Sequence, residues 1–237
     1  MPPLASPASL GTPRLHLRRI DSTSDRAREL ALAGAPHGTL VTADEQTSGR
    51  GRQGRSWSAP PGSALLMSLV LRSPPPLLPL IAALAVSDVA GEPAQIKWPN
   101  DIVLVQDGRL AKLAGILAEG RPQEGWAVLG IGLNVAVRVQ ELPPELHASA
   151  ATLGLTPAEV EPALAQLLAA LELRLGQDDE ATLAAWRQRD ALRGREVSWS
   201  AGRGRAEGID GTGRLIVALA DGGRAALDAG EVHLLSG

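Results

Sequence analysis

The sequence predicts an α+β protein in which a mostly antiparallel sheet with flanking helices is followed by a small β barrel. Apolar segments at hairpin spacing alternate with helical segments in the first part of the chain, and short strands broken by glycines follow from Gly194. At 237 residues the chain can hold a catalytic domain and a small appendage. We therefore predict one domain over residues 1–192 and a second over residues 193–237.

The first half of the chain is expected to alternate strands with helices. Arg14–Ile20 alternates polar and apolar residues, which predicts a strand, and the N-cap residues Asp21–Ser24 then predict a helix over Asp25–Leu32. The prolines Pro74–Pro76 end a further apolar strand, and the apolar segment Leu77–Val89 is expected to be a buried helix. The predicted strands that complete this sheet are Gly38–Ala43, Ala64–Leu71, Ile102–Val105, Lys112–Glu119 and Trp126–Val135, with a turn at Asp107–Gly108.

Two helices and the barrel complete the chain. Pro157–Leu175 and Glu180–Leu192 have helical periodicity, and Leu142–Leu153 is expected to be a loop. The short strands that follow have the spacing of a small barrel of about 45 residues. These strands are Glu196–Trp199, Ala206–Ile209, Leu215–Leu219, Ala225–Leu227 and Glu231–Leu235.

Composition excludes several classes of function. The formal net charge of -3 argues against a general nucleic-acid binder, and the absence of cysteine excludes disulfides, thiolate metal sites and a cysteine nucleophile. The four histidines are scattered without the spacing of metal ligands. Residues 1–13 contain no positive region followed by an apolar run, and no stretch of about 20 apolar residues exists, so we expect a cytoplasmic protein without a membrane span.

The segment Gln46–Trp57 carries three glycines, three arginines and a terminal tryptophan between two predicted strands. Glycine allows close approach of the backbone to a ligand, and arginine offers a permanent charge and a fork of donors. The pattern is typical of an anion clamp with an aromatic lid. Gly202–Arg205 repeats its core and is expected in a surface hairpin, so a solvated turn remains an alternative for Gln46–Trp57.

The segment Lys97–Asp101 places a cation, an aromatic ring, a proline, an amide and a carboxylate in sequence. Lysine can bind phosphate oxygens and aspartate can hold Mg²⁺, although an ordinary turn into a strand would look the same. Lys97 and Lys112 are the two lysines of the chain, and Asn100 and Asn134 are its two asparagines. We expect Lys112, on the next strand, to reach the same site. Ser22–Ser24 indicate either a polar pocket at a helix start or a plain cap.

Four motifs in this order resemble those of the biotin protein ligases: GRGRxGRxW within Gln46–Trp57, KWPND at Lys97–Asp101, KLAGIL at Lys112–Leu117 and GIGLNV at Gly130–Val135. The resemblance implies a class II synthetase-like catalytic domain and an SH3-like C-terminal barrel. It also implies an enzyme that condenses biotin with ATP to biotinyl-5′-AMP and pyrophosphate, and then transfers biotin to a lysine of the biotin carboxyl carrier protein of acetyl-CoA carboxylase.

The resemblance assigns roles to individual residues. Catalysis is implied for Arg52, Lys97, Asp101 and Lys112, with Asp101 also holding Mg²⁺. Ser24 stands where the family usually carries asparagine, so its contact is in question. The implied biotin-binding residues are Ser22, Thr23, Ser24, Gln46, Gly49, Arg50, Gly51, Arg52, Lys112 and Gly115, and the implied ATP-binding residues are Arg55, Trp57, Asn100 and Asn134, with Trp57 stacking on adenine.

Two other readings of the sequence were weighed. One is a lipoate or octanoate ligase or transferase, which has a related fold but resembles this chain less at GRGRxGRxW and KWPND. The other is a nucleic-acid module, which the acidic net charge and the lack of Phe and Tyr disfavour. Only about 13 residues precede the first predicted strand, so we expect no helix-turn-helix and no specific DNA binding. The Gly–Arg segment is expected to become ordered when ligands bind. The oligomeric state is open, and a homodimer is one of the states allowed.

Overall fold

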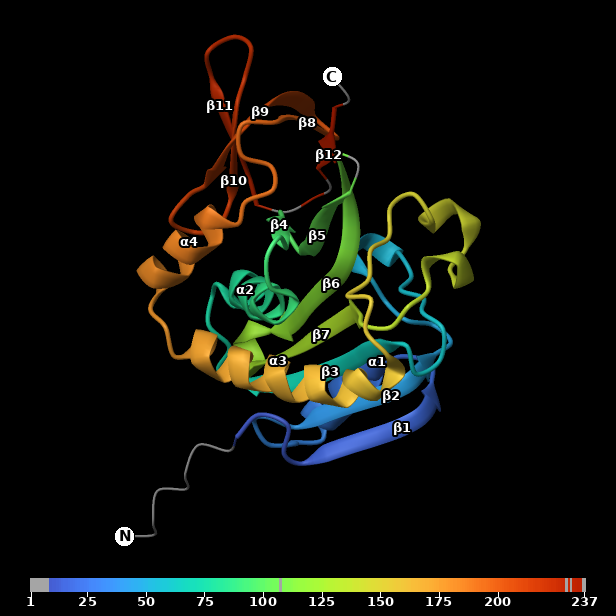
Figure 1. Ribbon diagram of the computed structural model, residues 1–237. Helices are drawn as coiled ribbons and strands as arrows, with labels where there is room; N and C mark the ends of the chain where they lie inside the picture. The colour runs from blue at the N-terminus through green and yellow to red at the C-terminus, as the bar shows by residue number, and fades with distance from the viewer. Residues whose placement is uncertain (1–8, 107, 229, 231, 236–237) are drawn as a thin grey trace, which may run out of the picture.

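The computed structural model describes residues 9–106, 108–228, 230 and 232–235, and it contains two sheets (Figure 1). The larger sheet has seven strands in the order β1-β2-β3-β7-β6-β5-β4. β1 pairs with β2 in parallel and all other pairs are antiparallel, which confirms the predicted character of this sheet. Its strands are β1 (Arg14–Ile20), β2 (Leu40–Gln46), β3 (Ala64–Arg72), β4 (Gln95–Lys97), β5 (Asp101–Gln106), β6 (Arg109–Arg121) and β7 (Trp126–Asn134).

Helices cover both faces of the larger sheet. The helix α1 (Thr23–Leu32) connects the parallel pair and packs on one face, where its small residues Ala27 and Ala31 allow a close approach to the valines of β2, β3 and β7. The helices α2 (Leu78–Ala90) and α3 (Val160–Leu175) pack on the main core at the other face (Figure 1). This arrangement leaves the ends of β5, β6 and β7 beside the small sheet for a site.

The start of α1 follows the expected capping chemistry. Ser22 is the N-cap residue with extended backbone, and its hydroxyl accepts a hydrogen bond from the Asp25 N–H at 3.4 Å. The helix begins two residues before the predicted start, so Thr23 and Ser24 lie in its first turn and are buried. The cap therefore fixes two hydroxyl side chains against the sheet.

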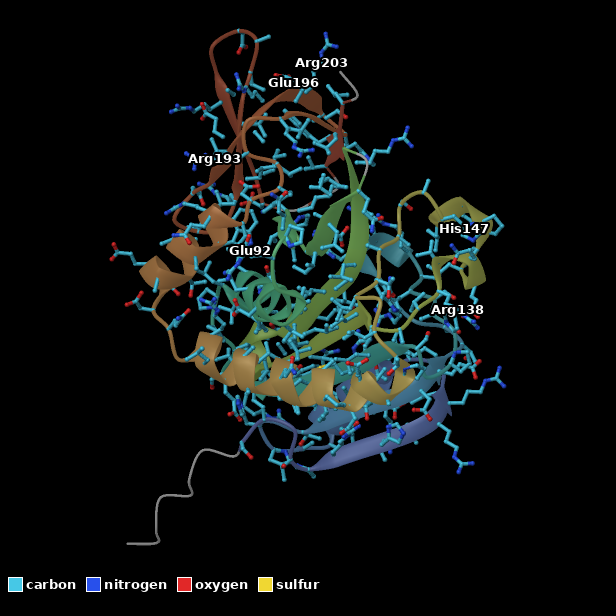
Figure 2. All side chains as sticks on the ribbon, viewed as in Figure 1. Glu92, Arg138, His147, Arg193, Glu196 and Arg203 are labelled. Atoms are coloured by element: carbon cyan, nitrogen blue, oxygen red, sulfur yellow. The ribbon has the colours of Figure 1, made fainter. Side chains whose placement is uncertain are left out.

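The segment between β7 and α3 crosses the end of the sheet as short turns (Figure 2, Arg138 and His147 labelled). The His147 ring Nε2 lies 2.7 Å from the Leu142 carbonyl oxygen, and the Lys112 N–H donates to the Ser149 carbonyl at 2.6 Å. The predicted loop therefore contains 3₁₀ turns and is tied to the edge of β6.

The C-terminal sheet is antiparallel with the order β11-β10-β9-β8-β12. The predicted barrel is wrong in one respect: within the described residues the sheet is open, because no strand pairing joins β11 to β12. The Gly202–Arg205 repeat opens β9 and pairs with β8 in a hairpin, as predicted. The expected turn residue Asp107 and the expected strand start Glu231 lie outside the described residues. The strands are β8 (Glu196–Trp199), β9 (Gly202–Ile209), β10 (Leu215–Ala218), β11 (Arg224–Leu227) and β12 (His233–Leu234).

The two sheets are joined at β4 and the turn that follows it. The Trp98 indole N–H donates to the Gly213 carbonyl at 3.0 Å, and Trp98 is 2% exposed. The Ile96 N–H donates to the Arg189 carbonyl at 2.7 Å, and the Ala191 N–H donates back to the Ile96 carbonyl at 2.9 Å. The helix α4 (Asp179–Gln188) thereby leads into the small sheet from a fixed position. In the described part of the chain, no helix has the length and apolarity to cross a membrane.

Candidate active site

A cavity of about 1260 Å³ lies where the ends of β5, β6 and β7 meet the small sheet and the Gly–Arg loop, defined here as residues Gly49–Trp57. Of the residues predicted for the site, Ser22 and Gly49 do not line it. Ser22 is occupied as the cap of α1, and Gly49 packs so closely that a Cβ there would lie 2.4 Å from the Trp57 carbonyl oxygen. The predicted residues that do line the cavity are Thr23, Ser24, Gln46, Arg50, Gly51, Arg52, Arg55, Trp57, Lys97, Asn100, Asp101, Lys112, Gly115 and Asn134.

The Gly–Arg loop is a small hairpin with its own hydrogen bonds. The Gly51 N–H donates to the Arg55 carbonyl at 2.7 Å, and the Trp57 N–H donates to the Gly49 carbonyl at 2.9 Å. Its tip requires left-handed backbone at Gln53, with a φ of 55°, which is uncommon for a residue other than glycine. The loop therefore has a defined shape that aims its arginines.

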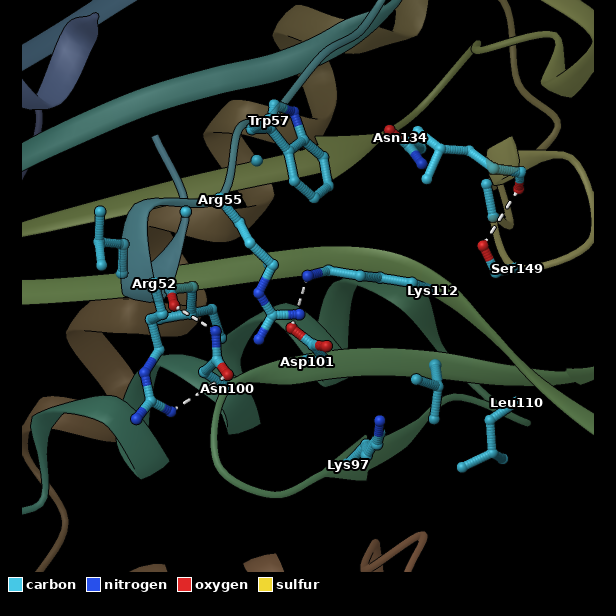
Figure 3. A pocket seen from close by; sticks show the side chains of 18 of the residues that line it. Arg52, Arg55, Trp57, Lys97, Asn100, Asp101, Leu110, Lys112, Asn134 and Ser149 are labelled. Atoms are coloured by element: carbon cyan, nitrogen blue, oxygen red, sulfur yellow. Dashed lines mark hydrogen bonds and ion pairs between the residues drawn. The ribbon is translucent and has the colours of Figure 1, made fainter. Parts of the chain in front are cut away.

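Cations from three separate segments meet in this cavity. Lys112 Nζ lies 2.7 Å from Asp101 Oδ1, and Arg52 Nη1 donates to Asn100 Oδ1 at 3.3 Å (Figure 3). Figure 3 shows Arg55 beside the same carboxylate and Lys97 below it on the neighbouring strand. Arg52, Lys97 and Lys112 thus share one cavity, which is the convergence that the sequence motifs predict.

The charge on Arg52 is incompletely compensated. Burial lowers the pKa of its guanidinium from the ordinary value, the Asp101 carboxylate acts in the opposite direction, and Arg55 lowers it further. Arginine remains protonated under these conditions because its ordinary pKa is so high. The guanidinium is therefore a partly desolvated cation, and an anionic ligand would relieve the cost of that desolvation.

The Trp57 indole lies on a shelf made by two glycines. A Cβ at Gly132 would lie 2.5 Å from Trp57 Cε2, and one at Gly115 would lie 3.1 Å from Trp57 Cζ3. Lys112 Nζ lies 5.6 Å from the ring centroid, within the range of a cation–π contact. One face of the ring is therefore covered by β6 and β7. The expected stacking on adenine would use the opposite face.

Asn134 presents an oriented acceptor. Its Nδ2 donates to the Ala151 carbonyl at 2.9 Å, which fixes the amide so that Oδ1 is the remaining group. Asn134 is 4% exposed, and among the described residues its Oδ1 has no hydrogen-bond partner; the same holds for Trp57 Nε1. Buried polar atoms are normally hydrogen-bonded, and both residues line the cavity, so a ligand can supply the missing partners.

The other end of the cavity is neutral and polar. Gln46 Oε1 accepts from the Thr23 N–H at 2.7 Å and from its hydroxyl at 3.0 Å. The Ser24 hydroxyl lies 3.0 Å from the Ser68 hydroxyl, and a Cβ at Gly130 would lie 2.7 Å from Ser24 Oγ. Donors and acceptors without charge suit a neutral polar group of a ligand.

Several lining residues were not predicted. The apolar side chains come from the β5–β6 hairpin and from the segment after β7, and a further group comes from the small sheet. Met67 comes from β3. None of these residues belongs to a motif, and only the apolar ones carried any signal, through their apolar character. These residues include Met67, Leu110, Leu142, Leu146, Arg195, Glu196, His233, Leu234 and Leu235.

The predicted magnesium site has one carboxylate. Asp101 is paired with Lys112, and the described residues contain no cluster of three or more His, Asp or Glu side chains suited to a metal. Mg²⁺ characteristically keeps several waters and is bound through one or two carboxylates plus substrate phosphates. The donor set therefore fits an ion held mainly by phosphate and water, with Asp101 as its protein contact.

The chain matches two family models. Residues 16–135 match the biotin/lipoate A/B protein ligase family, and residues 194–235 match the biotin protein ligase C-terminal domain. With both parts present and the cations gathered in one cavity, the chain belongs to the biotin/lipoate A/B protein ligase family and, within it, to the biotin protein ligases.

Relatives and solved structures agree with this assignment. The bifunctional ligase/repressor BirA of Bacillus subtilis is 42% identical over an alignment of 146 positions, which covers 56% of this chain and 44% of that protein. The biotin–[acetyl-CoA-carboxylase] ligase of Mycobacterium tuberculosis is 36% identical over 86% of this chain and 82% of its own length. The biotin protein ligase of Aquifex aeolicus, solved in complex with biotin and ATP, superposes with a TM-score of 0.79 at 27% identity, covering 94% of this chain and 99% of that one. The chain thus spans less than half of the Bacillus relative.

Proposed function

We propose that this protein is an ATP-dependent biotin protein ligase. In the first step a biotin carboxylate oxygen attacks the α-phosphorus of ATP, a bond to phosphorus forms, and pyrophosphate leaves. In the second step a lysine amine of a carrier domain attacks the biotinyl carbonyl, an amide forms, the amine loses a proton, and AMP leaves. The observation that carries this proposal is the convergence of Arg52, Lys97 and Lys112 on one cavity.

The arrangement of charge suits the first step. A carboxylate and a triphosphate are both anions, so the barrier to their approach is largely electrostatic, and fixed cations lower it without the cost of reorganisation. Asp101 holds Lys112 at 2.7 Å, which keeps the ammonium in the cavity before the substrates arrive. We propose that Lys112 and Arg52 stabilise the charge that develops between carboxylate and α-phosphate, with Lys97 near the departing phosphates.

The neutral end and the oriented amide are proposed to bind the two substrates' rings. Thr23, Ser24 and Gln46 would take the ureido ring of biotin, and the Asn134 oxygen would accept a hydrogen bond from an amino group such as that of adenine. Trp57, on its glycine shelf, would flank the base. Mg²⁺ would enter with ATP and neutralise phosphate charge beside Asp101.

The proposed carrier is the biotin carboxyl carrier protein of acetyl-CoA carboxylase, since the Mycobacterium tuberculosis relative is called biotin–[acetyl-CoA-carboxylase] ligase. The match to the biotin protein ligase C-terminal domain favours biotin over lipoate as the acyl substrate. A cytoplasmic location follows from this partner.

Biotin-dependent ATP–pyrophosphate exchange tests the proposal. We expect exchange with biotin and none with lipoate, and we expect Arg52→Ala to reduce the rate by about 10² to 10³, as for removal of one donor to a developing anion. Exchange that depends on lipoate, or that needs no acyl acid, would overturn the assignment of substrate.

A further inference from the structure

The first arginine of the Gly–Arg loop, Arg50, is bound to two carboxylates outside the loop. Its Nη1 donates to Asp25 Oδ1 at 2.7 Å, and its Nη2 donates to Glu119 Oε1 at 2.7 Å. Arg28 completes the group, with Nη2 2.9 Å from Glu119 Oε2 and Nη1 3.6 Å from Asp25 Oδ1. Two positive and two negative side chains therefore form a closed, neutral ring that joins the loop to α1 and β6.

The far end of the loop is held by packing. Trp57 rests on Gly132 and Gly115, as described above, and the hairpin bonds connect it to Arg50 through the antiparallel bridge between Arg50 and Ser56. The tip that carries Arg52 thus lies between an ion-pair ring at one end and an aromatic seat at the other. Both anchors are formed by side chains and glycines of this chain.

We propose that Asp25 and Glu119 are positioning residues which, through Arg50, hold the Gly–Arg loop closed before substrates bind. This inference rests on the proposed function, because it concerns the loop that carries Arg52 to the reacting anions. The resemblance implied a different role for Arg50, direct binding of biotin. With both Nη1 and Nη2 already paired to carboxylates, Arg50 acts on the chemistry through the loop instead of by direct contact.

Preorganisation is the advantage of such a latch. A loop that must order at each turnover reduces apparent affinity by the fraction of time it is disordered, whereas a loop held closed avoids this loss. The four side chains are partly exposed, between 29% and 42%, so the ring is also sensitive to ionic strength. The latch is therefore reversible and leaves a route for substrates to enter.

The experiment measures trypsin cleavage after Arg52 and Arg55 in the ligand-free protein, beside its thermal midpoint. The variants are Arg50→Ala, the pair Asp25→Asn with Glu119→Gln, and the combination of all three. The matched control is Glu29→Gln, which removes another carboxylate of α1, one that pairs with Arg26 at 2.6 Å. Arg50→Lys is included because it keeps the charge but offers fewer donors.

We expect slow cleavage in the wild type that biotin and ATP change little, which differs from the expectation, drawn from the sequence, that this segment becomes ordered when ligands bind. Arg50→Ala and the Asp25–Glu119 double variant should each be cleaved about 5- to 30-fold faster, the factor for losing one or two kcal/mol of local stability. The triple variant should be no faster than either, and biotin with ATP should restore protection in all three. Arg50→Lys should lie between wild type and Arg50→Ala, and Glu29→Gln should match the wild type.

Two results would overturn the inference. The first is a cleavage rate in the Asp25–Glu119 double variant equal to that of the wild type. The second is a triple variant cleaved faster than the double variant by the same factor that Arg50→Ala produces in the wild type, which would mean that Arg50 acts without these carboxylates. If a variant loses global stability, amide hydrogen exchange of the loop compared with that of β3 decides whether the opening is local. Failure of biotin-dependent exchange in the wild type would reject the proposed function, but would leave the proteolysis result intact.

Discussion

Replacement of Gly132 by alanine tests the glycine shelf beneath Trp57. The added Cβ would lie 2.5 Å from Cε2, 2.7 Å from Nε1 and 2.9 Å from Cδ2 of the indole. Carbon atoms pack best at about 3.5 to 4.0 Å, so the ring must move by about 1 Å. We expect a loss of about 1 to 3 kcal/mol, the usual range for overpacking, and a higher KM for ATP.

The assay is thermal unfolding, in which 1 kcal/mol corresponds to about 2 to 4 °C for a domain of this size. The matched control is Gly211→Ala, since a Cβ at Gly211 meets nothing within 4 Å; it should leave the midpoint unchanged. In a Trp57→Ala background the clash is absent, so Gly132→Ala should cost less than about 0.5 kcal/mol there. An equal cost in both backgrounds would refute the shelf, because the strain would then lie elsewhere.

Three further predictions follow from the described contacts. Lys112→Gln should lower the rate of biotin-dependent pyrophosphate exchange by about 10² to 10³ without a comparable change in the thermal midpoint. Lys112→Arg should not restore the rate, because a guanidinium would bind Asp101 through two donors and no longer present a compact ammonium to the substrates. Full rescue by arginine would contradict this. Asn134→Ala should raise the KM for ATP by about 10- to 100-fold, since loss of the acceptor for a buried donor costs about 1 to 3 kcal/mol. It should also reduce discrimination against GTP, measured by pyrophosphate exchange with each nucleotide. Unchanged discrimination would show that the Asn134 amide does not recognise the base. Burial would raise the pKa of Asp210, but hydrogen bonds from its own turn outweigh burial and lower the pKa to about 2, below the ordinary 3.8. The contribution of Asp210 to stability is therefore present above about pH 4 and is lost as the pH falls towards 2. Asp210→Asn should flatten this part of the curve of thermal midpoint against pH and Asp228→Asn should not; a curve that Asp210→Asn leaves unaltered would contradict the assignment.

Most elements of the fold were predictable because their signals are local. β1 has the predicted limits, Arg14–Ile20, since the alternation of polar and apolar residues over most of its length marks a strand. α1 follows the run of N-cap residues. The barrel was predicted from five short strands, and the strands exist, but whether the two edge strands pair is a long-range matter that spacing does not determine. The parallel pairing of β1 with β2 likewise depends on how α1 crosses the sheet.

The site was predictable in its charged residues and much less in its surroundings. Arg52, Lys97 and Lys112 were indicated by short motifs, and all three line one cavity. The partners of Arg50 were not foreseen, because Asp25 and Glu119 lie 25 and 69 positions away from it in the sequence and belong to no motif. Ser22 and Gly49 were assigned to biotin by resemblance, although capping and close packing account for both.

Both lysines of this sequence lie in the wall of the cavity, Lys97 on β4 and Lys112 on β6. An amine-selective acylating reagent therefore finds lysine side chains only at the place where substrates would sit, and the degree of labelling reports occupancy without an added tag. Surface coupling through lysine, a common way to immobilise an enzyme, would here modify the reaction chamber itself. An activated acyl group that leaves the cavity would find no other lysine of this chain to acylate.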